Sequence, residues 1–456
     1  MSKIISQNDF DTKQNADSIK LFFDRFHISS ILKSSNVRKT KGVAPVQILM
    51  YAFALVFKNK SMYMDMLLGS NSADFAKDTY YRFMKSIHIN WNRFTSMLAA
   101  NISKDVIIPA NSDDRINALI VDDSVFSRSC SQKVEMLAKI YDHAKKTFLY
   151  GFRMLTLGWT DGTTFLPVNQ VLLSSTSDNQ VNPSNPVDRR SNGFKRRQIA
   201  MMKGTDAMIE LIKEAKDAGL PADYVLFDSW FTSPKTLTAI ERLGYDVIAM
   251  VKRSSKMTFL YRGENLSLKD IYKKNRKRRG RSKYLLSVIV EAEKDDRRIP
   301  IKVVYVRNQS NRKDYLCLVS TDIEMDEEEI IRIYSKRWKI EVFFKVCKSY
   351  LKLAKECRAL SYDAITAHTA IVFARYMMLA VENRESEDPR TLGELFTYFI
   401  DEIADVTFAQ AFRLIMDLFS NMMTERFELG EEEISSMIDS FIAALTPSMQ
   451  RHLRVA

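Results

Sequence analysis

The stretch DEEEIIRIYSKRWKIEVFFKVCKSYL, residues 326–351, has the apolar spacing of one long helix. Asp326 is a good N-cap residue, and Glu329 follows three residues later, as in a capping box. At roughly 100° per residue, the helix has an apolar side that we expect to pack on a core, and a neighbouring polar side. The apolar side carries Ile333, Ile340, Phe343, Cys347 and Leu351. The polar side carries Tyr334, Arg337, Glu341, Lys345 and Lys348.

The polar side of this helix sets one carboxylate, that of Glu341, among cations. Cations in a line suit an acidic ligand, and the carboxylate suits a metal ion. An amphipathic surface helix with solvated charges is the alternative that the spacing alone leaves open. The rest of the sequence has to decide between the two.

The bulk composition favours a globular protein with a polyanionic partner. The chain has 456 residues, of which 46% are hydrophobic, so it is long and apolar enough for about two to four domains and is not predominantly disordered. Its formal net charge of +12 favours nucleic acid over a membrane as the partner. An ordinary basic protein has a similar charge, so the local clustering of cations carries more weight.

The cysteines and the apolar segments indicate a cytoplasmic protein without a membrane anchor. Cys130, Cys317, Cys347 and Cys357 form no CxxC pair, and we interpret them as reduced thiols. The first residues lack the apolar core of a signal peptide. The most apolar window, residues 365–381, contains a histidine and an arginine, and we expect a buried helix there.

Two short apolar runs each end in an acidic residue. Residues 118–121 precede Asp122 and Asp123, and residues 224–227 precede Asp228. Further strands are expected at 147–157, 163–173 and 246–251, and helices at 203–218 and 233–244, with a basic loop at 182–197. This order of strands and helices is typical of an RNase H-like fold, an α/β fold in which a mixed sheet carries carboxylates at strand ends.

A basic, β-rich segment interrupts this pattern. Between Lys252 and Lys283 there are thirteen Lys or Arg residues against two acidic ones, Glu264 and Asp270. So many cations repel one another without a counter-ion, which favours contact with phosphates over a solvated loop. The predicted contacts are Arg276, Lys277, Arg278, Arg279 and Arg281.

Helical regions are expected at both ends of the chain. Residues 74–94 interleave basic and aromatic side chains, which fits either a DNA-recognition helix or a small helical bundle with a charged exterior. The predicted organisation is a helical N-terminal domain (1–110), which the family resemblance described below makes the DNA-end-binding domain, the first part of an RNase H-like core (111–252), the basic insertion (253–322), the second part of the core (323–385) and a helical C-terminal region (386–456).

Asp122, Asp228 and Glu341 are the candidate catalytic and metal-binding residues. Three carboxylates brought together repel one another unless cations lie between them, and two divalent ions roughly 3.5–4 Å apart would meet this need. Ligation by oxygen alone favours Mg²⁺, with Mn²⁺ as the other possibility. Strand alternation turns Asp122 and Asp123 to opposite faces, so only one of them can bind the ions. We favour Asp122 and keep Asp123 as the alternative.

The motif Tyr334-x-x-Arg337-x-x-x-Glu341-x6-Lys348 resembles, at every position, the signature of the insertion-sequence transposases of the family four group, the DDE enzymes called YREK. Asp122 after Leu-Ile-Val, and Asp228 in Val-Leu-Phe-Asp-x-x-Phe, also fit that family's pattern. The resemblance covers about residues 115–350. It implies that Tyr334, Arg337 and Lys348 hold DNA phosphates near the cleavage site.

The resemblance implies a DNA transposase. Such an enzyme binds the terminal inverted repeats of its element, cleaves DNA with two Mg²⁺ ions, and joins the 3′ ends to target DNA. A homodimer in the end-paired complex is implied as well. Trp338 could stack on a base or pack in the core. A flipped base, if the cycle has a hairpin step, would have to rest on Phe259, Tyr261, Tyr272 or Tyr284, because the insertion has no tryptophan.

Two alternatives stay open at this point. One is an RNase H-like nuclease that hydrolyses DNA without strand transfer. The other is a DNA-binding protein that kept the fold of a transposase and lost its chemistry. The basic insertion argues against the first, and the presence of Asp122, Asp228 and Glu341 argues against the second.

Overall fold

The computed structural model describes residues 17–38, 41–67, 73–110, 115–129, 131–175, 179–278, 282–294, 297–308, 311, 314–355, 357–385, 392, 416, 423 and 431–444. The chain divides into two compact units, one drawn from residues 1–29, 41–76 and 388–456, and the other from residues 30–40 and 77–387. Each unit is described by itself. Cys130, one of the predicted thiols, lies outside the described residues.

The first unit is helical, as the sequence predicts for both ends of the chain. Its described helices are α2 (Asp17–Arg25), α4 (Pro45–Ala54), α5 (Met62–Leu67) and α16 (Glu431–Ala444), and α3 (Ile28–Ser34) leads into the second unit. Aromatic rings of α2 and α4 meet, with Phe23 and Phe53 edge to face at 5.3 Å. Tyr51 of α4 donates a hydrogen bond of 2.9 Å to the buried Asp65 of α5. These contacts join α2, α4 and α5 into one small core.

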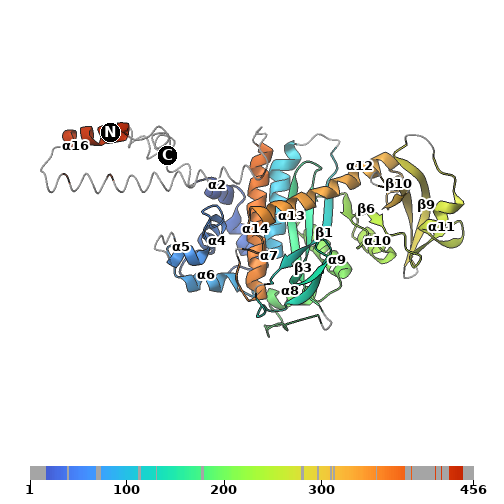
Figure 1. The fold of residues 1–456 in the computed structure, drawn as a ribbon, viewed down its shortest axis with the longest axis horizontal. Coiled ribbons are helices and arrows are strands. Elements are labelled where there is room, and N and C mark those ends of the chain that lie inside the picture. Colours follow the sequence, from blue (N-terminus) through green and yellow to red (C-terminus); the bar gives the residue numbers. More distant parts are fainter. Residues whose placement is uncertain are drawn as a thin grey trace. The chain divides into compact units, whose positions relative to one another are not determined.

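The second unit is built on a large mixed sheet (Figure 1). Its strands are β1 (Ala118–Ser127), β2 (Ala138–Asp142), β3 (Thr147–Thr160), β4 (Phe165–Leu173), β5 (Tyr224–Phe227), β6 (Asp246–Val251), β7 (Thr258–Tyr261), β8 (Glu264–Ser267), β9 (Tyr284–Lys294), β10 (Arg297–Arg307) and β11 (Tyr315–Ser320). The order is β2-β3-β1-β5-β6-β11-β10-β9-β7-β8, and β4 pairs with β3. In the described part of the sheet, only β1–β5 and β5–β6 are parallel. This is the expected RNase H-like arrangement, and the predicted fold class is confirmed.

Helices cover the core part of this sheet. They are α7 (Trp91–Ile102), α8 (Asn192–Ala200), α9 (Gly204–Asp217), α10 (Pro234–Glu241) and α14 (Tyr362–Glu385), while α6 (Lys77–Met84) packs on α14 and α11 (Leu268–Lys274) contacts β7 and β8 of the insertion. All nine residues of β4 are buried, because α7, α8, α9 and α14 contact this strand. The helices α6 and α7, which the sequence assigns to an N-terminal domain ending at residue 110, therefore lie in the second unit with the sheet.

The helix α14 is the apolar segment of the sequence. It is long and apolar enough to cross a membrane by composition, but the whole of its most apolar window is buried inside the protein. Arg375 within it is only 1% exposed. The expectation of a buried core helix at residues 365–381 is confirmed.

The basic insertion continues the sheet of the core. Strand β11 pairs antiparallel with β6, and β10 and β9 follow outward. The side chains of Tyr272, Tyr305 and Tyr315 stack at its centre, with Tyr272 and Tyr315 at 4.2 Å between ring centroids. Because main-chain pairing joins β6 to β11, the insertion and the core share one sheet.

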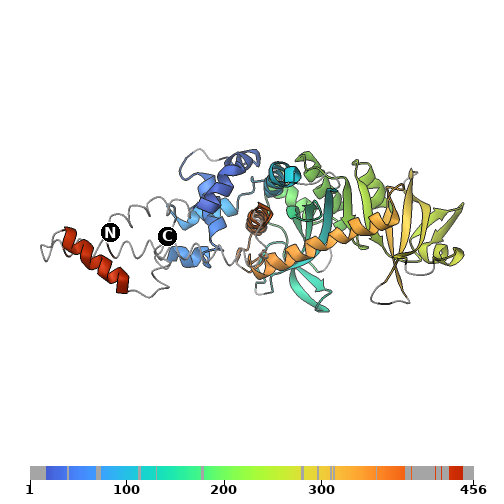
Figure 2. The ribbon, with the colours of Figure 1, turned by 90° about the horizontal axis from the view of Figure 1, so that it is seen from above.

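Residues 326–351 form a nearly continuous rod of three helical pieces. These are α12 (Glu327–Ser335), a 3₁₀ turn η3 (Lys336–Trp338) and α13 (Lys339–Ser349), seen as the long orange rod in Figure 2. Asp326 caps α12 as expected, but its side chain accepts from the Glu328 amide, while Glu329 binds Arg332. The predicted single helix is thus interrupted by one tight turn. The predicted apolar side of the rod is fully buried: Ile333, Ile340, Phe343, Cys347 and Leu351 are each 0% exposed.

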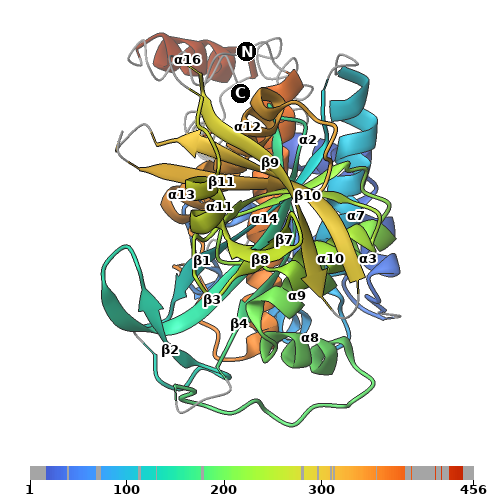
Figure 3. The same ribbon diagram turned by 90° about the vertical axis from the view of Figure 1, so that its right-hand side faces the viewer.

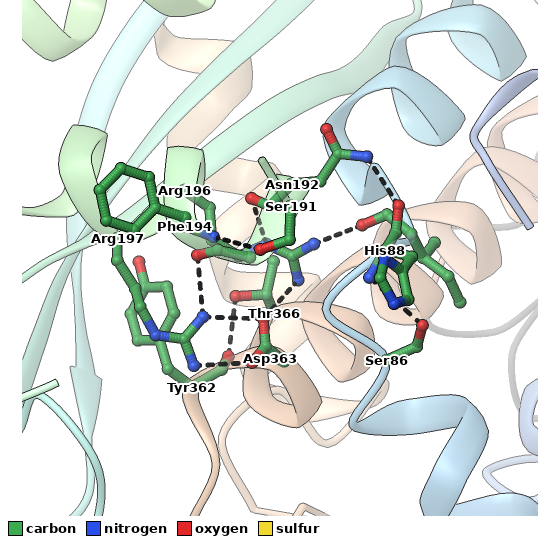
Figure 4. Close-up of polar contacts among 12 residues, drawn as sticks. Ser86, His88, Ser191, Asn192, Phe194, Arg196, Arg197, Tyr362, Asp363 and Thr366 are labelled. Atoms are coloured by element: carbon green, nitrogen blue, oxygen red, sulfur yellow. Dashed lines mark hydrogen bonds and ion pairs between the residues drawn. The ribbon is translucent and has the colours of Figure 1, made fainter. Parts of the chain in front are cut away.

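The predicted basic loop at 182–197 is in part the helix α8, capped by Ser191. Arg197 of this helix is 5% exposed and forms forked hydrogen bonds of 2.6–3.0 Å to Glu135 and Asp363, both of which are buried. Figure 4 shows Arg197 facing Asp363 at the start of α14. Its charge is therefore neutralised inside the protein and is not available to a ligand.

Replacing Arg197 with alanine should lower the free energy of unfolding by about 3–5 kcal/mol, because Glu135 would stay buried without its arginine and Asp363 would keep only Arg196 of its two arginines. Arg197→Lys should restore little, since an ammonium group cannot reproduce two forks. The measurement is urea or thermal denaturation, with Arg190→Ala as the exposed control on the same segment. Equal stability of Arg197→Ala and the control would mean that the network is not structural.

Candidate active site

Two of the predicted carboxylates lie where the parallel pairing of β1 with β5 ends: Asp228 follows β5 directly, whereas Asp122 lies within β1, which continues to Ser127 beyond the strand end that the sequence predicts. Strands β1 and β5 pair in parallel, and Val121 lies opposite Phe227 in the register. The next residues are Asp122 and Asp228, so both lie at the same edge of the sheet. The Asp228 side chain accepts a hydrogen bond of 2.9 Å from the Trp230 amide, which fixes the turn after β5.

The rod places the carboxylate of Glu341 near that of Asp122, with Arg337 between them. Helix α13 contacts β1, and the Arg337 guanidinium binds Asp122 at 2.7 Å and Glu341 at 2.9 Å. The side chains of Asp122 and Arg337 are each 16% exposed, and that of Glu341 is 36% exposed. One arginine of the signature therefore links two of the three carboxylates.

Asp123 has a different partner. Arg153 of β3 binds its carboxylate at 2.6 Å, and the Asp123 amide donates to the Asp122 carboxylate at 2.8 Å. Asp123 also lines a cleft beside the strand ends. The two aspartates thus point to different basic neighbours, as strand alternation predicts. The contact with the signature arginine favours Asp122 as the residue that works with Glu341.

Burial and the repulsion between neighbouring carboxylates raise the pKa of Asp122 and of Asp123. Burial raises the pKa of Asp122 to about 6, against the lowering effect of Arg337, and Asp123 and Asp228 raise it further. Burial also raises the pKa of Asp123, against Arg153, with Asp228 adding to the rise. Neighbouring carboxylates in a partly dry site have this effect, and a bound cation relieves it.

The donor set fits a divalent cation by its chemistry. Asp122, Asp228 and Glu341 offer only carboxylate oxygens, which hard ions prefer. Within the described residues, however, no group of three His, Cys, Asp or Glu side chains lies close enough to share an ion. The reason is visible in the contacts of Arg337, whose guanidinium lies between Asp122 and Glu341. Ion binding by all three carboxylates therefore requires that Arg337 release them.

The other residues of the signature surround this centre. Burial and the nearby carboxylates of Asp228 and Asp122 raise the pKa of Tyr334 to about 12, against the lowering effect of Arg337. Lys348 donates a hydrogen bond of 2.5 Å to Ser124 on β1. Lys345 is exposed. Trp338 is 62% exposed, so of its two predicted roles, packing in the core does not apply.

Three of the five predicted cations of the insertion belong to the described residues, and two of these three are exposed. Arg276 and Arg278 are exposed, and Lys277 lies over the ring of Tyr272 at 4.6 Å. Arg279 and Arg281 lie outside the described residues. Three of the four aromatic residues proposed to hold a flipped base belong to the core of the insertion, because Phe259 is 1%, Tyr261 8% and Tyr284 5% exposed. The fourth, Tyr272, is partly exposed and is stacked on Tyr315.

Trp230, two residues after Asp228, is a candidate that the sequence reasoning missed. It is 54% exposed, with the Lys252 ammonium 4.3 Å and the Arg153 guanidinium 5.5 Å from its ring centre. An exposed indole between two cations suits a nucleotide, whose base stacks while its phosphate meets the charges. The signal that could have pointed to Trp230 in the sequence is its position two residues after Asp228.

The comparison with known families agrees with this geometry. The profile of the family described as DDE superfamily endonuclease matches residues 29–313, which include Asp122 and Asp228 and end before the rod that carries Glu341. No curated protein gives a significant match. The matched segment is more than half of the chain. The chain therefore belongs to the DDE superfamily endonucleases, which generally use divalent metal ions and act on DNA.

Proposed function

We propose that this endonuclease is a transposase of the YREK kind. It binds the terminal inverted repeats of its own element, cleaves DNA there, and joins the freed 3′ ends to target DNA. The proposal is supported chiefly by the contacts of Arg337 with Asp122 and Glu341, together with the place of Asp228 at the end of the strand paired with the one that carries Asp122. A nuclease site built from an unrelated helix has no reason to carry Tyr334 and Lys348 at the same spacing.

Asp122, Asp228 and Glu341 would hold the ions, with Mg²⁺ preferred, Mn²⁺ tolerated, and two ions per site. When bound, the ions would activate a water or a 3′-hydroxyl and stabilise the leaving oxygen of an in-line displacement. The residues of the chain supply position. Buried residues of β1 and β5 hold the two aspartates in place, and the apolar side of α13 packs the helix that carries Glu341 against β1.

Arg337 has two successive partners in this proposal. Without DNA it binds Asp122 and Glu341 and offsets their repulsion. A DNA phosphate offers the same forked geometry as a carboxylate, so the guanidinium can move to the phosphate when the carboxylates take ions. Tyr334 lies beside it and would hold an oxygen of the same phosphate, while Lys348, which contacts Ser124 on β1, would hold a phosphate further along the strand. This exchange makes DNA binding and ion binding support each other.

The wider surface supplies further DNA contacts. Trp338 and Lys345 project from the exposed side of the rod, and Arg276, Lys277 and Arg278, with Arg279 and Arg281, would bind phosphates along the insertion. Trp230 is the aromatic platform nearest the strand-end aspartates. The active form would be a homodimer holding two element ends, acting in the cytoplasm on the nucleoid.

The test is to incubate the purified protein with DNA carrying the ends that flank its own reading frame, with and without Mg²⁺. We expect Mg²⁺-dependent nicks at the element ends, followed by products in which those ends are joined to a target plasmid. Nicks without any joined product would favour a nuclease without strand transfer. End binding without nicks would favour a DNA-binding protein that has lost its chemistry.

Ion binding should depend on pH through Asp122. The pKa of this carboxyl is raised to about 6, so below that pH it carries a proton that must leave when an ion binds. The affinity for Mn²⁺ should therefore fall by about tenfold for each pH unit below 6. Calorimetric titration of DNA-free protein between pH 5 and 8 measures this. An affinity that stays constant across this range would remove Asp122 from the ligand set.

A further inference from the structure

A large cleft opens beside the strand-end carboxylates, and no pattern in the sequence indicated it. Its volume is about 1370 Å³, which exceeds the usual size of a pocket for one small molecule. Asp123 and Arg153 are among its lining residues and lie next to the candidate active site. Most of the rest of the lining comes from the end of β1, from the hairpin β2–β3 and from residues 353–355, 357 and 358 after α13.

The cleft is basic. Besides Arg153 and Lys348, its lining includes Arg128, His143, Lys145, Lys355 and Arg358. Its two carboxylates are occupied by the protein itself: Asp123 binds Arg153, and Asp142 accepts from the Ala144 and Lys145 amides at 2.9 and 3.2 Å. The side chains of Lys355 and Arg358, by contrast, are exposed. Because both carboxylates are bound within the protein, the charge that the cleft offers to a ligand is positive.

The walls of the cleft are held in place by a buried residue. Arg128 is 9% exposed and donates to the carbonyl oxygens of Cys357 and Ala359, the latter at 2.6 Å. This contact ties the segment after α13 to the end of β1. The cleft is thus a built feature of the fold, with one wall from the sheet and one from the segment that continues the signature rod.

The other wall carries exposed aromatic rings. Figure 3 shows β3 extending past β1 to form the projecting hairpin with β2. On this hairpin Tyr141, which lines the cleft, lies 5.1 Å from Phe148 and 5.0 Å from His143 between ring centroids. Phe148 is the cross-strand partner of Tyr141 and lies just outside the lining; it is 57% exposed, with the Lys139 ammonium 5.2 Å from its ring. Exposed rings beside cations are typical of platforms on which unpaired bases stack.

We propose that this cleft binds a single strand of DNA that leads away from the site of cleavage. Cations on the floor would hold its phosphates, and Tyr141 and Phe148 would stack on its bases. Paired bases inside a duplex cannot stack on these rings, so the aromatic wall favours a separated strand. The place of the cleft in the reaction rests on the proposed function, whereas its preference for a single strand does not.

The test measures binding without cleavage. Full-length protein in EDTA is titrated into a fluorescent single-stranded oligonucleotide of arbitrary sequence, and into the duplex of the same sequence, by anisotropy. Phe148→Ala should weaken single-strand binding about tenfold, and Phe148→Trp should retain it. Lys355→Ala with Arg358→Ala should weaken it and reduce the salt slope by about 1.4. In both cases duplex binding should change less than about twofold.

Controls separate the outcomes. Lys213→Ala with Arg242→Ala removes two cations of α9 and of the end of α10, outside the cleft, and should leave both affinities unchanged. Thermal denaturation of each variant checks the fold. Wild-type single-strand binding by the cleft variants, an equal loss of duplex binding, or a preference for RNA over DNA would each overturn the proposal. Because no ion is present and no element end is used, these results do not depend on whether the protein cleaves.

Discussion

Glu341→Gln should reduce Mg²⁺-dependent cleavage of element ends by about a thousandfold or more, because the amide removes a charge that the ions need and keeps the shape of the side chain. The amide oxygen of the new side chain would still accept a hydrogen bond from Arg337, which lies 2.9 Å from Glu341 in the native protein. Binding of end DNA in EDTA should therefore stay within about twofold of the wild type. Gel-based cleavage and anisotropy on the same DNA measure the two quantities.

The matched control is Glu329→Gln, on the same rod. Glu329 pairs with Arg332 and is not near Asp122, so its loss should leave cleavage almost unchanged. If Glu341→Gln and Glu329→Gln cleave equally, Glu341 is not part of the active site. A variant Glu341→Gln that fails to bind DNA would instead point to a structural role through Arg337.

Asp122→Asn and Asp123→Asn should differ sharply. Asp122 faces the signature rod through Arg337, whereas Asp123 faces Arg153 and the cleft. We expect Asp122→Asn to lose about a thousandfold in cleavage and Asp123→Asn to lose no more than about tenfold. The comparison uses the same end DNA, with cleavage followed over time at saturating Mg²⁺.

A metal-binding measurement makes the comparison of Asp122→Asn with Asp123→Asn independent of cleavage activity. Each variant is titrated with Mn²⁺ without DNA, where Asp122→Asn should lose affinity and Asp123→Asn should not. The reverse order would assign the ligand to Asp123. If both variants keep the Mn²⁺ affinity of the wild type, neither Asp122 nor Asp123 binds the ion.

The core of the fold could be predicted from local patterns, because strand ends and helix faces are set by nearby residues. The short apolar runs before Asp122 and Asp228 became adjacent parallel strands, and the apolar side of the rod became buried. Their meeting in space follows from the parallel pairing, which the order of elements in the sequence already suggests. The RNase H-like fold class was confirmed for the same reason.

Features that depend on distant partners could not be predicted. Arg197 stands in a polar, basic stretch of sequence, yet Glu135 and Asp363, more than sixty residues away on either side, draw it into the interior. The exposure of Trp230 after β5, and the place of Tyr141 on a hairpin beside the cleft, are set by tertiary contacts that periodicity does not reveal. The position of Arg337 between two carboxylates is likewise a property of the folded chain.

The rod of residues 326–351 contacts both the insertion and the core of the second unit. Its first helix contacts β9 and β11 of the insertion, and its last contacts β1 beside Asp122. A short 3₁₀ turn, Lys336–Trp338, separates the two and includes Arg337. Under the proposed function, a duplex bound by the insertion would therefore act on Arg337 through this joint, and so would link DNA binding far from the catalytic centre to the start of cleavage.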